Sequence, residues 1–325
     1  MLLNLLLLVI GLAGLYYGSE WLVTGASRIA EGFRISPLII GLTIVAIGTS
    51  VPELVVSILA AFDGRPGLAL GNVIGSNIAN IGLILGLTGT VHVISVEKGL
   101  VKREIPIMIG ATIFATILAF DGQLNRLDGV LLLFGFIVFS AFFYYISQHE
   151  NGNGGEDIQE DIASPETDEN GAVKVHMAME FGRIVIGLTV LVIGARLLVN
   201  GAVSIAEAMG VSDLVIAVTM VALGTSLPEL ATSLTAAFKG QGDMAVGNVI
   251  GSNVANLLLV LGATSTVATI DIGQTDLSIV EYIVMLIFSI ALLPFVRNRK
   301  LSRIESAFFL GFYFAFIIYS LFFSR

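Results

Sequence analysis

The sequence has no cysteine, and only 13% of its 325 residues are charged. Without cysteine the chain has no disulfide, no thiolate metal site and no thiol nucleophile. A soluble domain carries about 25% charged residues, so this chain has roughly half the usual solvating charge. Its lysines and arginines are also few, 16 against 25 acidic residues, and form no basic cluster interleaved with aromatic residues. The composition therefore excludes a water-soluble enzyme and a nucleic-acid-binding protein.

Apolar residues are abundant instead, with 56% of the chain hydrophobic and a mean hydropathy of +0.94. They form ten runs, each close to the ~20 residues that a helix needs to cross a bilayer. The runs lie at residues 2–24, 37–62, 70–93, 104–120, 127–146, 181–202, 212–238, 245–268, 279–296 and 304–323. They lack the alternation of barrel strands. The sequence therefore predicts an all-α polytopic protein of a lipid bilayer, with ten transmembrane helices.

The positions of lysine and arginine predict which side each connection faces. If the N-terminus lies outside and the ten helices alternate, 12 basic residues fall on the cytoplasmic side and 4 on or near the outer side. Positive residues collect on the cytoplasmic side of membrane proteins. We therefore expect a multi-pass protein of the plasma membrane with its N-terminus outside.

The chain contains an internal repeat. Residues 11–86 align with residues 187–262 without a gap, and 41 of these 76 positions are identical. A unit of five helices crosses the membrane an odd number of times, so the two copies must have opposite orientations. We expect two inverted five-helix repeats, at 1–146 and 176–325. Inverted repeats are typical of alternating-access transporters, whose sites lie near the bilayer midplane.

The segment between the repeats, residues 147–175, has eight acidic residues and one lysine. Glycine, asparagine and acidic residues with little apolar content are typical of a disordered linker. The segment matches no EF-hand loop. We expect a cytoplasmic linker there, and nothing in the sequence indicates an obligate protein partner.

Two acidic residues, Glu53 and Glu229, lie in the middle of apolar runs. An ionised side chain at the centre of a membrane helix costs about 2.5–3.5 kcal/mol on insertion scales. No lysine, arginine or histidine lies within the same helix core to neutralise either carboxylate. A metal cation or a transported proton is the natural partner. The alternative is a protonated glutamate that only bonds a backbone carbonyl.

Each glutamate follows a proline, and a Gly-Thr-Ser motif precedes each proline by one residue. Proline removes a backbone donor and clashes with the carbonyl four residues earlier. We therefore expect the helices to break at Gly48–Pro52 and Gly224–Pro228 and to expose carbonyls beside the carboxylates. Ca²⁺ takes about six to eight such oxygen ligands. Nearby hydroxyls extend the set, although they also bond their own helix backbone; they belong to Thr49, Ser50, Thr225 and Ser226.

A second motif, Gly-Asn-Val-Ile-Gly-Ser-Asn-x-Ala-Asn, begins at Gly71 and again at Gly247. Its GxxxG spacing lets another helix approach closely. Its serine and its last asparagine are four residues apart and share one helical face. These residues are Ser76, Asn80, Ser252 and Asn256. Such a polar stripe suits ion coordination, and the alternative is a set of hydrogen bonds between helices.

These paired motifs resemble the two α-repeats of the cation/calcium exchanger superfamily, specifically its sodium/calcium exchanger branch. The resemblance implies an antiporter in which Na⁺ drives Ca²⁺ the other way, commonly three for one, so that transport is electrogenic. It implies that Glu53 and Glu229 bind Ca²⁺ and share the flanking Na⁺ sites, while Thr49 and Thr225 give backbone carbonyls to Ca²⁺. The Na⁺ sites would include Ala46, Ala222, Ser50, Ser226, Ser76 and Ser252, and the central position would be bordered by Asn80 and Asn256.

Some relatives, including the potassium-dependent branch, carry aspartate at the position of Asn256. With only two carboxylates the site neutralises one Ca²⁺, which argues against K⁺ co-transport. A proton/Ca²⁺ antiporter stays open because protons would also discharge the glutamates, although such members usually have a Gly-Asn-Ala-x-Glu motif. A cation channel is less consistent with the inverted repeat. The chain has no nucleotide-binding loop, so we expect a carrier of Na⁺ and Ca²⁺ that is not an enzyme and uses no organic cofactor.

Overall fold

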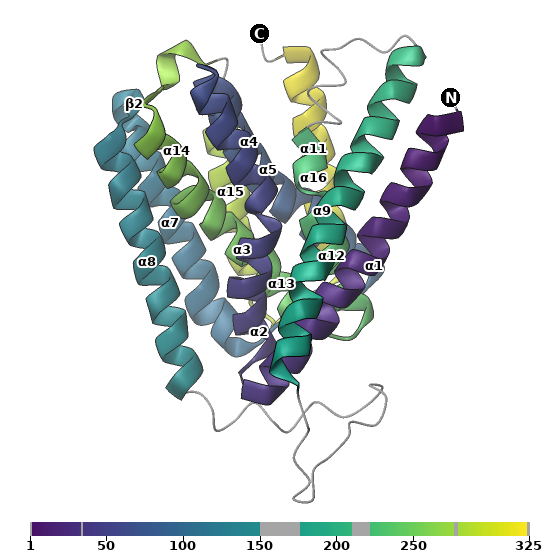
Figure 1. Ribbon diagram of the computed structural model, residues 1–325. Coiled ribbons are helices and arrows are strands. Elements are labelled where there is room, and N and C mark those ends of the chain that lie inside the picture. The colour runs from purple at the N-terminus through teal and green to yellow at the C-terminus, as the bar shows by residue number, and fades with distance from the viewer. Residues whose placement is uncertain (1, 34, 150–175, 210–221, 276–278, 324–325) are drawn as a thin grey trace, which may run out of the picture.

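The computed structural model describes residues 2–33, 35–149, 176–209, 222–275 and 279–323. Within these residues the protein is almost entirely helical (Figure 1), as the sequence predicts. Most of the acidic segment 147–175 lies outside the described residues, as does the first part of the run 212–238. The expectation of a disordered linker stays a prediction.

The first half of the chain begins with the long helix α1 (Leu2–Phe33). A bent stretch follows, formed by α2 (Pro37–Ile40), the π-helical η1 (Gly41–Val45), α3 (Ala46–Thr49) and α4 (Val51–Phe62). The third stretch joins α5 (Pro66–Ala79), the π-helical η2 (Asn80–Leu85) and α6 (Gly86–Val91). Strand β1 (Ile94–Ser95) leads to η3 (Leu100–Glu104), α7 (Ile105–Leu118), η4 (Ala119–Asp121), β2 (Gln123–Leu124) and α8 (Arg126–His149).

The second half follows the same plan where it is described. It begins with α9 (Met177–Ala208), which has 32 residues like α1. The short α11 (Ala222–Thr225) precedes α12 (Leu227–Phe238), and a long stretch joins α13 (Gly242–Val254), η6 (Ala255–Val260) and α14 (Leu261–Val267). The last elements are β3 (Ile270–Asp271), η7 (Ile272–Gln274), α15 (Ile279–Phe295), β4 (Lys300–Leu301) and α16 (Arg303–Phe323).

Seven described helices are long and apolar enough to cross a membrane, and an eighth span results if Pro37–Thr49 and Val51–Phe62 count as one. Two other predicted runs do not reach this length: α15 has 17 residues, and the run 212–238 is described only from residue 222. α1 and α9 extend beyond the predicted runs, and the last turns of α1 contact the first turn of α9 through Arg28 and Glu180. Ten membrane helices therefore remain a prediction.

Both predicted helix breaks occur where the prolines require them. α3 ends at Thr49 and α4 begins at Val51, with a bend of 40° between the two parts of the span. In the second half, α11 ends at Thr225 and α12 begins at Leu227. The residues between, Ser50 and Ser226, have ψ angles of 2° and 3°, outside the helical range. Pro52 and Pro228 have no N–H to continue the hydrogen-bond ladder, which interrupts the regular helix at each break.

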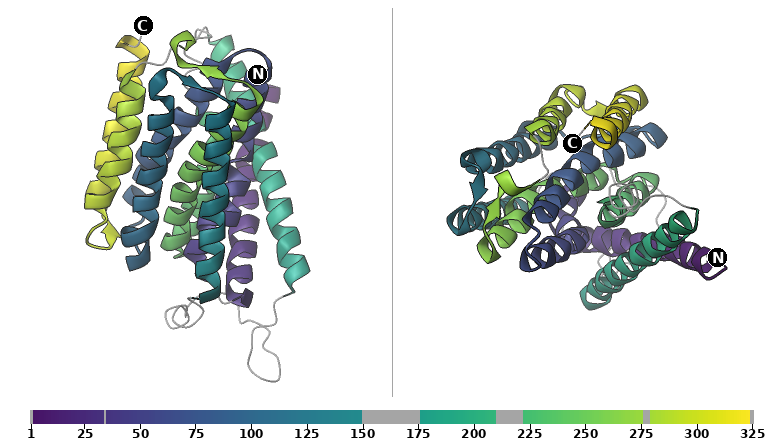
Figure 2. Two further views of the ribbon diagram at one scale, coloured as in Figure 1. Left: turned by 90° about the vertical axis from the view of Figure 1, so that its left-hand side faces the viewer. Right: turned by 90° about the horizontal axis from the view of Figure 1, so that it is seen from above.

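The molecule is a helical bundle with α13 at its centre. In the apolar stretch of the span Gly242–Val267, 94% of the residues are buried inside the molecule. In the apolar stretch of α16 only 17% of the residues are buried. Seen along the bundle, α1, α9 and α16 lie toward the outside (Figure 2). Their exposed leucine, isoleucine and phenylalanine side chains form a surface suited to lipid.

The two halves of the chain interlock through close helix crossings. α1 and α9 lie side by side and cross at glycines (Figure 1): a Cβ atom at Gly18 would lie 2.6 Å from the Leu191 nitrogen, and one at Gly194 would lie 2.8 Å from the Leu15 nitrogen. α13 packs in the same way on α2 and η1. Glycine is required at such crossings because the backbones touch.

Two short antiparallel ladders, which the sequence did not predict, also join the halves. β1 pairs with β4 through Ile94 and Leu301, and β2 pairs with β3 through Leu124 and Ile270. Each strand has only two residues, too short for an alternating pattern to be recognised. The ladders fix the helix connections at both ends of the bundle.

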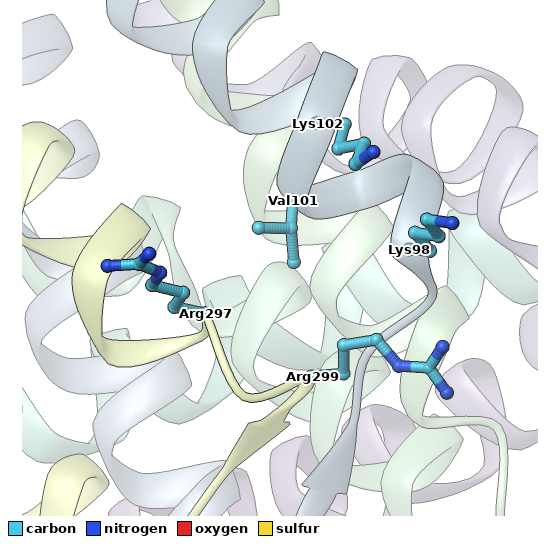
Figure 3. A pocket seen from close by; sticks show the side chains of 5 residues that line it. All are labelled: Lys98, Val101, Lys102, Arg297 and Arg299. Atoms are coloured by element: carbon cyan, nitrogen blue, oxygen red, sulfur yellow. The ribbon is translucent and has the colours of Figure 1, made fainter.

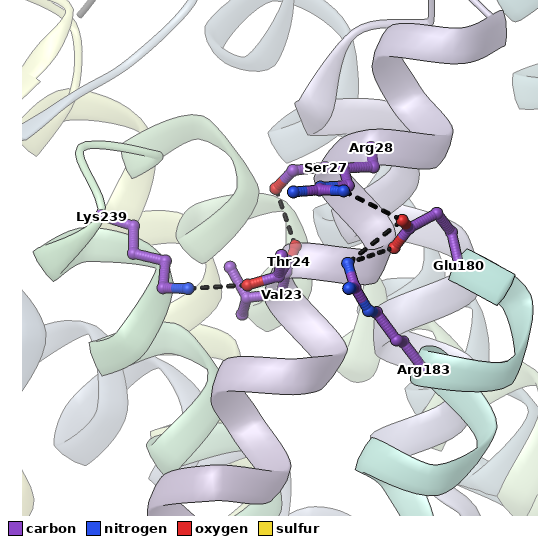
Figure 4. A network of polar contacts seen from close by, with 7 residues as sticks. All are labelled: Val23, Thr24, Ser27, Arg28, Glu180, Arg183 and Lys239. Atoms are coloured by element: carbon purple, nitrogen blue, oxygen red, sulfur yellow. Dashed lines mark hydrogen bonds and ion pairs between the residues drawn. The ribbon is translucent and has the colours of Figure 1, made fainter. Parts of the chain in front are cut away.

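An ionic cluster holds α1 against α9 near one end of the bundle (Figure 4). Glu180 is buried and pairs with Arg28 at 3.3 Å and Arg183 at 3.0 Å. Nearby, the Ser27 hydroxyl donates to the Val23 carbonyl at 2.7 Å. One buried carboxylate therefore connects two arginines from different helices.

We expect Arg28→Gln and Arg183→Gln to have non-additive effects on the free energy of unfolding. Either single change leaves Glu180 with one arginine partner. Because each arginine is about a third exposed, the single change should lower the free energy of unfolding by at most about 1 kcal/mol. The double change leaves a buried carboxylate unpaired and costs about 3 kcal/mol. Thermal unfolding of the detergent-solubilised protein measures all three variants. A double effect equal to the sum of the single effects would contradict the shared role of Glu180.

Candidate cation-binding site

Glu53 and Glu229 stand in the first turns of α4 and α12, directly after the two helix breaks. Both side chains are completely buried. Among the described residues, the two carboxylate oxygens of Glu53 have no hydrogen-bond partner, and Glu229 has a partner for one oxygen only. Neither carboxylate forms an ion pair with a described residue. A buried charge without a partner is very costly. The pair therefore requires positive charge from outside this part of the chain.

The hydroxyl groups beside each glutamate come from the other half of the chain. The Ser50 hydroxyl donates to Oε1 of Glu229 at 3.5 Å, and Thr49 also lies beside Glu229. Thr225 and Ser226 lie beside Glu53 in the same way. Each helix break thus faces the carboxylate of the opposite half, and the two carboxylates are close enough to repel each other.

Asn72 connects three parts of this site. Its Nδ2 donates to the backbone carbonyl of Glu53 at 3.2 Å and to the Ser57 hydroxyl at 2.9 Å, and its Oδ1 accepts from the Thr225 hydroxyl at 3.3 Å. The amide therefore fixes the turn that carries Glu53 and orients a threonine from the second half.

The same contacts recur 176 residues later around Asn248. Its Nδ2 donates to the Glu229 carbonyl at 3.4 Å and to the Ser233 hydroxyl at 3.0 Å, and its Oδ1 accepts from Thr49 at 3.3 Å. The site residues predicted from the sequence do not include Asn72, Asn248 or these two serines. A signal existed: Ser57 and Ser233 fall four residues after the glutamates, on the same helical face.

The predicted serines of the second motif also reach the breaks. Ser252 lies 3.5 Å from the Ala46 carbonyl oxygen and 3.4 Å from the Thr49 hydroxyl. Ser76 accepts a hydrogen bond from Ser226 at 3.3 Å. Ala222 is the first residue of α11. The structure therefore gathers hydroxyl and backbone oxygens around both glutamates.

Asn80 and Asn256 are buried one turn further along their helices. Asn80 donates to Oδ1 of Asn253 at 3.0 Å, but its own Oδ1 has no partner among the described residues. Both polar atoms of Asn256 also lack a partner there. Buried amides without partners are rare. No described hydrogen bond joins either asparagine to a glutamate, so the expectation that they border the site stays a prediction.

The described residues contain no group of three or more histidine, cysteine, aspartate or glutamate side chains that could hold a metal. A cation at this site would be held by two carboxylates with hydroxyl and carbonyl oxygens. Such ligands suit hard cations, including Ca²⁺. Figure 1 places α3, α12 and α13 near mid-height of the bundle, where a membrane-buried site would lie.

The family described as "Sodium/calcium exchanger protein" matches residues 3–145 and 179–322. The chain belongs to the sodium/calcium exchanger family. Its proteins are ion exchangers, so the protein is a multi-pass membrane transporter. The match omits the acidic segment between the halves and covers both segments that carry the glutamates.

Individual members of the family are similar over nearly the whole chain. The sodium/calcium exchanger MaX1 of Methanosarcina acetivorans is 34% identical over 342 residues, which cover 97% of both chains. The inner membrane protein YrbG of Escherichia coli is 36% identical over 93% of this chain and 92% of its own. A solved structure of the sodium-calcium exchanger NCX_Mj is 38% identical, covers 98% of both chains and superimposes with a TM-score of 0.82.

Proposed function

We propose that this protein is an antiporter that exchanges Na⁺ for Ca²⁺ by alternating access. The observation that carries the proposal is the pair of buried carboxylates, one from each half, with no ion pair in the described part of the chain. Their two negative charges match the charge of one Ca²⁺. The surrounding neutral oxygens are ligands that Na⁺ and Ca²⁺ both accept. Family membership supports the same two ions.

The ions are assigned as the family resemblance suggests. Glu53 and Glu229 bind Ca²⁺ with the backbone carbonyls of Thr49 and Thr225, and the glutamates also serve the Na⁺ sites. Asn72 and Asn248 hold these groups in place. The remaining Na⁺ ligands come from Ala46, Ala222, Ser50, Ser226, Ser76 and Ser252, and the site is bordered by Asn80 and Asn256.

The proposed architecture is ten transmembrane helices in two inverted repeats, 1–146 and 176–325, joined by the acidic linker. The matching hydrogen bonds of Asn72 and Asn248 support a duplicated unit. α1 begins and α16 ends at one end of the bundle, while α8 ends and α9 begins at the other (Figure 1). This supports opposite sides of the membrane for the N-terminus and the linker, and the excess of lysine and arginine on the linker side favours a cytoplasmic linker with the N-terminus outside the plasma membrane.

Charge then couples the two ion movements. An empty site with two bare carboxylates resists exposure to the opposite side, whereas a cation-filled site changes orientation readily. If three Na⁺ exchange for one Ca²⁺, one net charge moves in each cycle. A membrane potential of 100 mV then contributes about 2.3 kcal/mol to the direction of exchange. Uptake rates that ignore a K⁺/valinomycin potential would exclude this electrogenic form.

The proposal is tested with the purified protein in liposomes loaded with Na⁺ and diluted into Na⁺-free buffer containing ⁴⁵Ca²⁺. We expect Ca²⁺ uptake that requires internal Na⁺ and does not follow an imposed pH gradient. Uptake that follows the pH gradient would instead identify a proton/Ca²⁺ antiporter. Flux far above carrier rates without countertransport would identify a channel.

We expect Asn256→Asp to change the cation dependence of transport. The substitution adds a third carboxylate to a buried site, which then needs another positive charge. The interaction between one added negative charge and a cation a few ångströms away is worth more than about 1.4 kcal/mol at protein dielectric. The Na⁺ or K⁺ concentration for half-maximal uptake should therefore shift about tenfold or more. Asn298→Asp, which changes an exposed residue, is the control. Identical ion dependence in both variants would place Asn256 outside the site.

A further inference from the structure

A surface pocket of about 400 Å³ opens between η3 and the connection from α15 to β4 (Figure 3). It is lined by Lys98, Val101, Lys102, Arg297 and Arg299. We call it the basic pocket, because four of its five residues are cationic. They come from two segments about 200 residues apart, each next to an apolar helix, α7 or α15. The pocket therefore lies at the level where membrane helices meet lipid head groups.

The positive charge of the basic pocket is not balanced by the described residues. None of its four cations forms an ion pair there. Of the nearest acidic residues in sequence, Glu104 accepts from Arg103 at 2.7 Å, and Glu97 accepts from the Ser36 hydroxyl at 3.3 Å and forms no ion pair with a lining cation among the described residues. Four like charges around one pocket favour a bound anion.

The backbone of the pocket is held in an unusual conformation. Arg299 has a φ of 62°, the only positive φ of a described residue other than glycine. Its N–H donates to the Val296 carbonyl at 2.9 Å, and its carbonyl accepts from the Val96 N–H at 3.0 Å. Such strain persists only where the surrounding structure imposes it, and it is common at binding sites. The β1–β4 ladder next to Arg299 supplies that constraint.

An apolar pocket adjoins the basic pocket. It has a volume of about 370 Å³ and is lined by Val101, Leu293, Pro294 and Arg297. Val101 and Arg297 line both pockets, so a ligand could occupy them together. A free phosphate ion would use only the cationic part, whereas a phospholipid has both a charged phosphate and an apolar chain.

We propose that the basic pocket binds the phosphodiester of an anionic phospholipid, and that the adjoining apolar pocket receives the first carbons of an acyl chain. Arginine is well suited to phosphate because its fork of N–H groups matches the phosphate oxygens. The connection from α15 to β4, which supplies Arg297 and Arg299 to the lining, lies at the end of the bundle opposite the termini (Figure 2), and this is the end expected to face the cytoplasm. Basic pockets between membrane helices on that side bind anionic head groups in other proteins.

The test measures lipid binding to the full-length protein in detergent, and it does not depend on the proposed exchange activity. Phosphatidylglycerol is titrated and bound lipid is counted by native mass spectrometry. Arg299→Gly removes one cation and also suits the positive φ, so the fold is retained. Lys300→Gln removes an exposed cation next to Arg299, at the start of strand β4, that does not line the pocket.

We expect Arg299→Gly to weaken phosphatidylglycerol binding about fivefold, and Arg297→Gln with Arg299→Gly about 25-fold, since each nearby cation contributes about 1 kcal/mol. Lys300→Gln should change binding less than twofold. An equal loss of phosphatidylglycerol binding in Lys300→Gln would overturn the proposal, because it would indicate a diffuse attraction between the basic surface and the lipid. Equal binding of phosphatidylcholine would remove the role of the anion, and full competition by millimolar glycerol phosphate would reassign the pocket to a free phosphate compound.

Discussion

Glu53→Gln is expected to abolish Na⁺-dependent Ca²⁺ uptake, and Glu229→Gln should do the same. Glutamine has nearly the same shape but no charge, so the variant leaves one carboxylate to hold a divalent cation at a buried site. Removal of one partner from a buried charge pair costs about 3–5 kcal/mol. Because about 1.4 kcal/mol corresponds to a factor of ten, ⁴⁵Ca²⁺ uptake should fall at least about 100-fold in either variant.

The matched control is Glu20→Gln. Glu20 is 39% exposed and lies 3.7 Å from Lys239, and an exposed pair of this kind contributes little. Its variant should transport Ca²⁺ at the unmodified rate. Thermal unfolding separates loss of transport from loss of folding. A folded Glu53→Gln or Glu229→Gln protein with full exchange would refute the proposed site.

The second large effect is expected at Gly251, where α13 crosses η1 and α3. A Cβ atom there would overlap the Leu42 carbonyl oxygen and lie 2.7 Å from the Cβ atom of Ala46. Gly251→Ala must therefore push α13 away from the segment whose Ala46 carbonyl faces Ser252. Overpacking of this kind costs about 1–3 kcal/mol of stability. We expect a lower unfolding temperature and at least about a tenfold loss of Ca²⁺ uptake.

Gly135→Ala makes the same change in helix α8 without an overlap. The nearest atoms to an added Cβ are 3.7 Å away on Leu258, which is an ordinary contact. Since alanine favours a helix over glycine by about 0.5–1 kcal/mol, this variant should be at least as stable as the parent and transport normally. If Gly251→Ala behaved like Gly135→Ala, the close crossing would not be needed for transport.

Several features of the fold could be predicted from local sequence. Long apolar runs indicated membrane helices because hydropathy acts over about 20 consecutive residues. Pro52 and Pro228 indicated both helix breaks because proline disrupts its own turn. Glu53 and Glu229 were recognisable as candidate site residues because an ionisable side chain in an apolar run is costly wherever the helix lies.

Other predictions depended on comparing one part of the sequence with another. The repeat at 11–86 and 187–262 indicated that whatever surrounds Glu53 should recur around Glu229. The hydrogen bonds of Asn72 and Asn248 follow this rule, although neither asparagine was among the predicted site residues. Their role was hidden because an asparagine in a membrane helix serves equally well as a bridge between helices.

By itself, the sequence determined that the chain is a duplicated membrane protein with two buried carboxylates, each beside a broken helix. Only the tertiary structure decided that Ser50 faces Glu229, that Thr225 bonds Asn72, and that Lys98 and Arg297 line one pocket. The physical reason is the distance along the chain. Hydropathy and proline act within one or two helical turns, whereas these contacts join residues more than 150 positions apart and arise only when the helices pack.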